Sequence, residues 1–232
     1  MTAGQLALGV KLRDDARFDN FHGQRNAQAA SRLRAAVERQ GRAPSVIVCG
    51  DQDTGKSHLL QAISHLAEQS GRPAVCVSME EFLPFGPEAL GGLELNEVVC
   101  LDDLDRVAGR PEWEEAAFHL YNRVGDQGGQ IVISLSDLPA KLPFLLPDLI
   151  SRLRHGLLVQ LGINRDDDRM RILIARAKQR GLVMTRDVAA FILKRAPRRL
   201  EDLLAVLDQL DDNSLKAQRR LTIPFVKSVM GW

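Results

Sequence analysis

The segment 50–60 carries the strongest chemical signal in the chain. It reads GDQDTGKSHLL and matches the phosphate-loop pattern Gly50-x-x-x-x-Gly55-Lys56-Ser57 at each fixed position. The glycines let backbone N–H groups turn towards phosphate oxygens, and the helix that follows presents the positive end of its dipole. Lys56 would reach the β- and γ-phosphates, and the Ser57 hydroxyl would bind Mg²⁺. The candidate nucleotide-binding residues of this loop are Gly50, Asp51, Gln52, Asp53, Thr54, Gly55, Lys56, Ser57 and His58.

A second signal lies at the end of the apolar run VVCLDD. Asp102 would stand at the carboxyl edge of a sheet, facing the phosphate loop, where a carboxylate can hold Mg²⁺. Asp103 is the candidate for polarising an attacking water. Many hydrolases with this loop have the longer glutamate there, so the aspartate predicts slow intrinsic hydrolysis. The alternative is that Asp103 is a solvated acid after a strand.

Apolar runs alternate with amphipathic stretches through the first two-thirds of the chain. The runs that predict short buried strands are 45–50, 74–78, 97–103, 130–136 and 156–161. Helical patterns occupy 26–40, 57–69 and 112–124. Nearly continuous apolar strands separated by helices favour an α/β fold with a five-stranded parallel sheet covered on both faces.

Strand signals stop after Leu161, and only helical patterns follow. They cover 167–180, 186–195 and 198–210, with a short one from Thr222. We therefore expect an N-terminal tail at 1–12, an α/β nucleotide-binding domain at 13–162 and a small C-terminal helical lid at 163–232.

The composition excludes several classes of protein. The net charge is +1, so no global field attracts nucleic acid or a membrane surface. The chain has neither a signal-peptide pattern nor an apolar run of about 20 residues, which predicts a cytoplasmic protein. Cys49, Cys76 and Cys100 each lie in an apolar run and match no metal spacing, so we expect buried thiols.

Several segments, taken in order, resemble AAA+ ATPases and more narrowly the DnaA/Hda family. They are the phosphate loop, VVCLDDLD, VISLSDLP, LISRLRHGL and KRAPRRLEDLL. AAFHLYNRV and the C-terminal LTIPFVKSV extend the resemblance over nearly the whole chain, from Phe18 to Val229. It implies an adenine nucleotide, ADP or ATP, with Mg²⁺ as cofactors and DnaA as a partner.

Further site residues rest on this resemblance alone. Asp137 corresponds to the sensor 1 group that reads the γ-phosphate, and Arg198 in APRRL to the sensor 2 arginine of the lid. Arg152 in LISRL corresponds to the arginine finger, which completes the site of a neighbouring protomer. Phe21 and His22 correspond to the segment that flanks the adenine base. Taken without the resemblance, an arginine in these segments is more often a solvated surface charge.

The N-terminal tail contains QLALGV, which resembles the peptides that dock on the bacterial sliding clamp. Gln5 would hydrogen-bond at the groove of the clamp, while Leu6, Leu8 and Val10 would fill apolar pockets. Gly9 and Val10 depart from the bulkier family ending, which could reduce affinity. The alternative is an apolar tail that packs on its own domain.

The resemblance implies a negative regulator of replication initiation. Such a protein holds nucleotide, docks on the DNA-loaded clamp of DNA polymerase III and stimulates ATP hydrolysis by DnaA through Arg152, either as a monomer or as a homodimer. One alternative is a DNA-binding initiator or helicase loader, which the arginine-rich stretch 165–199 favours and the acidic run 166–168 opposes. The other is a free-standing ATPase, which Lys56 and Asp102 permit.

Overall fold

The computed structural model describes residues 16–38, 45–217 and 220–232. Its centre is a five-stranded parallel sheet with the strand order β2-β3-β4-β1-β5. The strands are β1 (Val46–Cys49), β2 (Ala74–Ser78), β3 (Val98–Asp102), β4 (Gln130–Leu135) and β5 (Leu157–Gln160). The predicted α/β fold with a five-stranded parallel sheet is confirmed.

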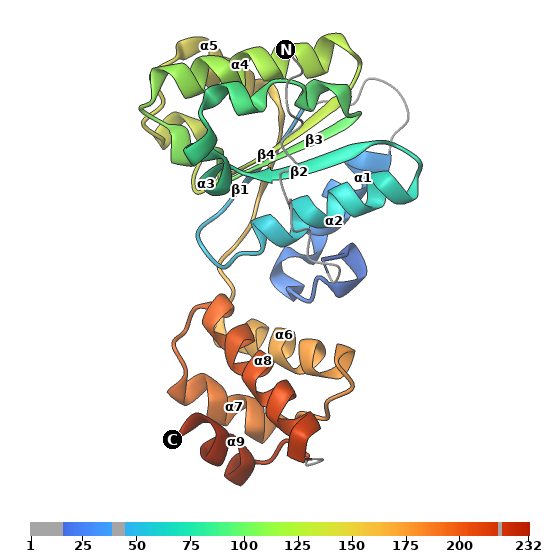
Figure 1. The fold of residues 1–232 in the computed structure, drawn as a ribbon, viewed down its shortest axis with the longest axis vertical. Helices are drawn as coiled ribbons and strands as arrows, with labels where there is room; N and C mark the ends of the chain where they lie inside the picture. The colour runs from blue at the N-terminus through green and yellow to red at the C-terminus, as the bar shows by residue number, and fades with distance from the viewer. Residues whose placement is uncertain (1–15, 39–44, 218–219) are drawn as a thin grey trace, which may run out of the picture.

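Helices cover both faces of the sheet, which explains why its strands read as nearly continuous apolar runs. Helices α1 (Ala27–Glu38) and α2 (Lys56–Gln69) pack on one face, and α4 (Pro111–Asp126) and α5 (Pro147–His155) on the other (Figure 1). Successive side chains of β1 alternate between the two cores. Ile47 belongs to the α4/α5 side and Val48 to the α1/α2 side.

The C-terminal helices form a separate bundle with its own apolar core (Figure 1). They are α6 (Asp166–Gln179), α7 (Arg186–Arg195), α8 (Leu200–Ala217) and α9 (Ile223–Met230). Thr185 and Thr222 cap α7 and α9 by accepting hydrogen bonds from the N–H groups of Val188 and Phe225. The predicted helical lid is thus present. The exact domain limits at residues 12 and 162 stay predictions.

Several short helical elements were not expected from the sequence. Besides α5, they are α3 (Met79–Phe82) and the 3₁₀ turns at Phe18–Asn20, Gln24–Asn26, Leu83–Phe85, Pro87–Leu90, Leu93–Leu95, Leu104–Val107 and Pro139–Lys141. Helix α5 has Pro147 in its first turn and buries Leu149 and Leu153, one turn apart. A single apolar pair is too short a pattern to identify a helix from sequence. The failure to predict α5 matters because this helix carries Arg152.

The strand order brings the predicted phosphate chemistry to one edge of the sheet. The loop follows β1, and Asp102 ends β3, with β4 lying between these two strands. Parallel strands direct their carboxyl ends to the same edge. Cys49, Cys76 and Cys100 are buried in the sheet, as expected. Among the helices that the structure describes, none is long and apolar enough to cross a membrane.

Candidate nucleotide site

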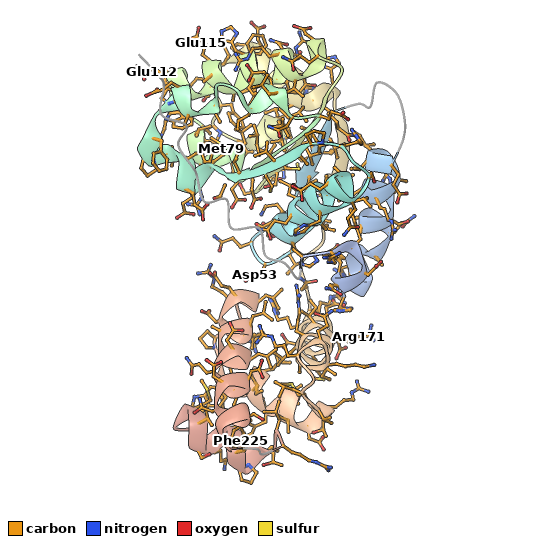
Figure 2. All side chains as sticks on the ribbon, turned by 45° about the vertical axis from the view of Figure 1, so that its right-hand side comes forward. Asp53, Met79, Glu112, Glu115, Arg171 and Phe225 are labelled. Carbon is orange, nitrogen blue, oxygen red and sulfur yellow. The ribbon has the colours of Figure 1, made fainter. Side chains whose placement is uncertain are left out.

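A cavity of about 640 Å³ lies where the phosphate loop, the segment 20–23 and the lid meet. This volume is in the range of small-ligand sites. Figure 2 shows Asp53 of the loop at the junction between the α/β domain and the lid. The lining residues from the loop are Gln52, Asp53, Thr54, Gly55, Lys56, Ser57 and His58, whereas Gly50 and Asp51 are not among them.

The loop has the backbone conformation that its glycines permit. Gly55 has a φ of 98°, and a Cβ atom added there would lie 2.7 Å from the Phe21 ring. A Cβ added at Gly50 would lie 2.9 Å from the Thr54 hydroxyl. Asp53 also has a positive φ of 62°. Helix α2 starts directly after Gly55 with no side-chain cap, so its first N–H groups face the loop without a side-chain acceptor.

Lys56 lies inside the loop with its side chain 8% exposed. Its ammonium donates to the Gly50 carbonyl at 2.9 Å and to the Asp51 carbonyl at 3.3 Å. The Asp103 carboxylate lies 3.7 Å away. The ammonium is therefore held at the mouth of the loop by oxygen atoms. The oxygens of an incoming phosphate can replace these acceptors or bind the ammonium beside them.

The two acidic residues after β3 have different surroundings. Asp102 is buried, accepts a hydrogen bond from the Ser134 hydroxyl at 2.6 Å and is not among the cavity-lining residues. Asp103 lines the cavity, and its N–H donates to the same Ser134 oxygen at 2.7 Å. Burial, followed by the charge of Asp102, raises the pKa of Asp103, while Lys56 opposes the rise. A carboxyl group with a raised pKa is better matched to accepting a proton near neutrality.

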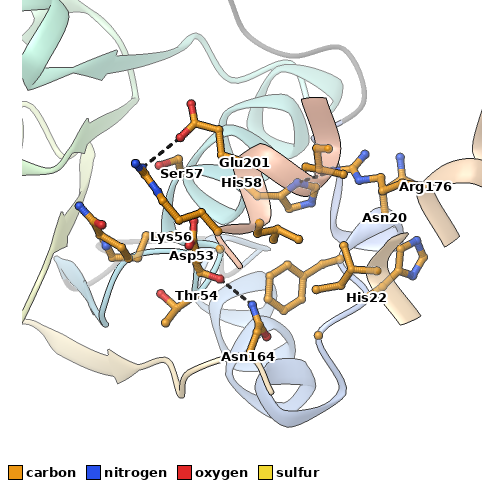
Figure 3. Close-up of a pocket in the computed structure, with 18 of the residues that line it drawn as sticks. Asn20, His22, Asp53, Thr54, Lys56, Ser57, His58, Asn164, Arg176 and Glu201 are labelled. Atoms are coloured by element: carbon orange, nitrogen blue, oxygen red, sulfur yellow. Dashed lines mark hydrogen bonds and ion pairs between the residues drawn. The ribbon is translucent and has the colours of Figure 1, made fainter. Parts of the chain in front are cut away.

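The other end of the cavity is built from aromatic and polar groups (Figure 3). The Phe21 ring lies 5.7 Å from the His58 ring, centroid to centroid, and His22 also lines the cavity. Asn164 is 3% exposed, and its Nδ2 donates to the Asp53 carbonyl at 2.6 Å. The Asn164 Oδ1 atom is buried and has no hydrogen-bond partner among the described residues.

Helix α6 of the lid contacts this end through two polar side chains. The Arg176 guanidinium donates to His58 Nδ1 at 3.0 Å and to the Gln179 oxygen at 3.3 Å. Because that bond fixes the Gln179 amide, its nitrogen donates to His22 Nε2 at 3.1 Å. Burial, followed by the charge of Arg176, lowers the pKa of His22. Both imidazoles are thus used as acceptors in their neutral form.

Asn164 and Arg176 were missed by sequence reasoning, although one of them left a signal. Arg176 falls on the buried stripe of α6, beside Leu173 and Ala177, where an apolar residue is expected. A charged residue at such a position indicates a specific partner. Asn164 lies in the connection between β5 and α6, where no periodicity constrains side chains, so it left none.

Comparisons with known proteins give consistent results. A family model described as the lid domain of Hda matches residues 166–230, and one for the bacterial DnaA ATPase domain matches residues 92–160. A Haemophilus influenzae protein described only as uncharacterized is 39% identical over 227 residues, covering 97% of this chain and 98% of that protein. The chain belongs to the DnaA/Hda family of AAA+ proteins.

Solved structures show the same fold. Domain III of Thermotoga maritima DnaA superimposes with a TM-score of 0.79 at 22% identity, covering 94% of this chain and 96% of that one. DnaA of Aquifex aeolicus bound to AMPPCP gives a TM-score of 0.73 at 22% identity, covering 89% of this chain and 68% of that one. Thermotoga maritima RuvB gives 0.68 at 18% identity, covering 95% and 72%.

The residues that the family resemblance implies as sensors can now be located relative to the cavity. Arg199, not Arg198, is among the cavity-lining residues, and it pairs with Glu201 at 3.2 Å. Both arginines are exposed, so exposure does not separate them, and Arg198 stays the predicted sensor 2 residue. Asp137 accepts from the Leu138 N–H at 2.7 Å and pairs with Lys141, and it does not line the cavity. In this conformation the structure does not bring Asp137 to the site.

Arg152 lies elsewhere on the α/β domain. Helix α5, which carries it, is at the end of the domain opposite the lid (Figure 1), and Arg152 is exposed and outside the lining of the cavity. The predicted clamp-docking residues Gln5, Leu6, Leu8 and Val10 lie outside the residues that the structure describes.

Proposed function

We propose that this protein is a nucleotide-bound regulator that stimulates ATP hydrolysis by DnaA and so limits replication initiation. The main observation in its support is that Arg152 lies far from the protein's own nucleotide cavity. Arg152 is exposed on α5, away from the cavity that its own phosphate loop lines. A guanidinium in that place can serve the site of a neighbouring protomer but not its own, which is how an arginine finger acts in trans.

The proposed ligand of the cavity is an adenine nucleotide, ADP or ATP. Gly50 and Gly55 allow close approach of the backbone, and Lys56 supplies the positive charge for the phosphates. Phe21 and His22 would flank the base. The AMPPCP-bound DnaA structure with the same fold supports this choice of ligand.

Mg²⁺ is part of the same proposal. The described residues contain no cluster of three or more metal-ligating side chains. Mg²⁺ often binds proteins through one or two carboxylates together with phosphates and waters, so such a cluster is not required. Ser57 and Asp102 are the proposed protein ligands, and Asp103 the group that would accept a proton from water. The ion would add charge stabilisation at the phosphates when bound.

The proposed partners are DnaA and the DNA-loaded sliding clamp, which places the protein in the cytoplasm at the replisome. The tail 1–12 would dock on the clamp through Gln5, Leu6, Leu8 and Val10, and the α/β domain would then meet DnaA with α5. The Hda lid match supports this assignment within the family.

Arg152 provides the decisive test. Arg152→Ala should lower DnaA-dependent phosphate release by about 10³-fold or more under single-turnover conditions, because the charge that builds on the transferring phosphoryl group loses its partner. Arg152→Lys should not restore the rate, since an ammonium cannot reproduce the planar forked donor. Arg154→Ala, which changes an exposed arginine of the same helix, is the matched control.

The melting temperature, nucleotide affinity and clamp binding of Arg152→Ala should match those of the unaltered protein. Normal stimulation by a well-folded Arg152→Ala protein would refute the finger in trans. It would favour a protein that remodels DNA directly, which a salt-dependent DNA shift without clamp would reveal.

A further inference from the structure

Glu114 of α4 is a carboxylate buried completely in the α/β domain. It accepts hydrogen bonds from three backbone N–H groups: Gly109 at 2.7 Å, Leu145 at 2.8 Å and Leu146 at 2.7 Å. Burying a carboxylate is unfavourable unless hydrogen bonds compensate for the lost hydration. An apolar side chain in this place would leave the three N–H groups without this acceptor. The contacts of Glu114 therefore point to a task that an apolar residue cannot perform.

Two of those N–H groups, of Leu145 and Leu146, belong to the segment that starts α5, whereas Gly109 lies just before α4. Leu146 is the N-cap residue of α5, and Pro147 in its first turn has no N–H to offer. Glu114 thus holds the last two N–H groups before the helix begins. The Leu146 carbonyl accepts from the Ile150 N–H at 3.2 Å, so fixing Leu146 also fixes the first turn.

Tyr121, which is seven residues after Glu114 on the same face of α4, contacts the other end of α5. Its hydroxyl lies 3.5 Å from the Arg152 carbonyl oxygen and 2.6 Å from the Ser45 hydroxyl. Its ring lies beneath the Arg152 guanidinium, 6.0 Å from centroid to Cζ. Helix α4 therefore holds α5 just before its first residue, at Leu145 and Leu146, and again at Arg152.

We propose that Glu114 and Tyr121 are positioning residues that set the direction in which Arg152 leaves the protein surface. This inference rests on the proposed role of Arg152 in trans. A group that must meet a developing charge works only within a narrow range of positions, and a rigid support maintains that range. Neither residue would touch the nucleotide of either protomer.

Glu114→Gln tests the inference with the smallest change of shape, since the amide replaces one acceptor oxygen with a donor. Tyr121→Phe removes only the hydroxyl and keeps the ring beneath the guanidinium. Glu115→Gln is the matched control, because Glu115 is an exposed neighbour on the surface of the α/β domain (Figure 2). It pairs with His119 at 3.5 Å. DnaA-dependent phosphate release is measured against the concentration of each variant, to separate the maximal rate from the half-saturating concentration.

We expect Glu114→Gln to lower the maximal rate by about tenfold, since small displacements of a catalytic group have effects of this size or larger. The half-saturating concentration should not change, because the docking surface is intact. Tyr121→Phe should lower the same quantity less, and Glu115→Gln should leave it unaltered. Hydrogen exchange should quicken at the amides of Leu145 and Leu146 in Glu114→Gln, with the phosphate loop unaffected.

A maximal rate equal to that of the unaltered protein, despite faster exchange at Leu145 and Leu146, would overturn the inference. So would an effect confined to the half-saturating concentration, which would make Glu114 part of docking. If Glu114→Gln does not fold, Tyr121→Phe decides the matter by the same criteria. Absence of stimulation by the unaltered protein would instead refute the proposed function.

Discussion

The ammonium of Lys56 is the single group on which nucleotide binding should depend most. It is buried in the loop and tied to two carbonyl groups, so it is already in place before a phosphate arrives. We predict that Lys56→Ala lowers the affinity for ADP or ATP by tenfold or more, a loss of about 1.4 kcal/mol or greater. Isothermal titration calorimetry measures it, with Lys194→Ala on the exposed side of the lid as the control.

An unchanged affinity of Lys56→Ala would show that the loop does not hold phosphate. The Lys56→Ala variant also tests the surroundings of Asp103, because Lys56 opposes the rise of the Asp103 pKa. Removing the ammonium should raise the Asp103 pKa further, so a carboxyl group with a higher titration midpoint is the expected signature in the variant.

At the scale of elements, the contact between α6 and the segment 20–23 should depend on pH. His22 is neutral where it accepts from Gln179, and its pKa is below the ordinary 6.5. Below pH 6.5 the unfolded chain therefore binds more protons at this residue than the folded one. The contribution of His22 to stability is complete above that pH and is lost as the pH falls through the lowered pKa.

We predict that the melting temperature of the nucleotide-free protein falls as the pH drops below 6.5, and falls less in His22→Gln, whose amide accepts a hydrogen bond without titrating. His119→Gln, which alters an exposed histidine of α4, should keep the full fall. Identical pH profiles for His22→Gln and the unaltered protein would mean that this contact does not depend on the charge of His22.

At the scale of the whole molecule, we expect clamp docking and nucleotide binding to depend on different parts of the chain. The cavity lies at the junction of the α/β domain and the lid, whereas the predicted docking motif lies in the tail 1–12, outside the residues that the structure describes. We predict that replacing Gln5, Leu6 and Leu8 with alanine abolishes co-elution with the sliding clamp and leaves nucleotide affinity unchanged. Lys11→Ala, just beyond the motif, is the control. Continued co-elution of the triple variant would move the docking site elsewhere.

Much of the fold follows from local pattern. The apolar runs identify all five strands, because a strand buried on both faces must be apolar throughout. The periodic helices of the lid are equally visible, and so is the loop, whose glycines, lysine and serine are required by the geometry of phosphate binding. These features depend on neighbours within a few residues, so the sequence alone determines them.

Only the tertiary structure reveals the contacts between residues that lie far apart in the sequence. The Asn164 amide reaches the Asp53 carbonyl across 111 positions, and Arg176 reaches His58 across 118. No local period records such pairings, because the strand order and the docking of the lid create them. The same holds for Glu114, which reads as an ordinary charged helical residue until the fold buries it against the N–H groups of Leu145 and Leu146. Local physics thus specifies the elements, whereas long-range packing selects which side chains share a site.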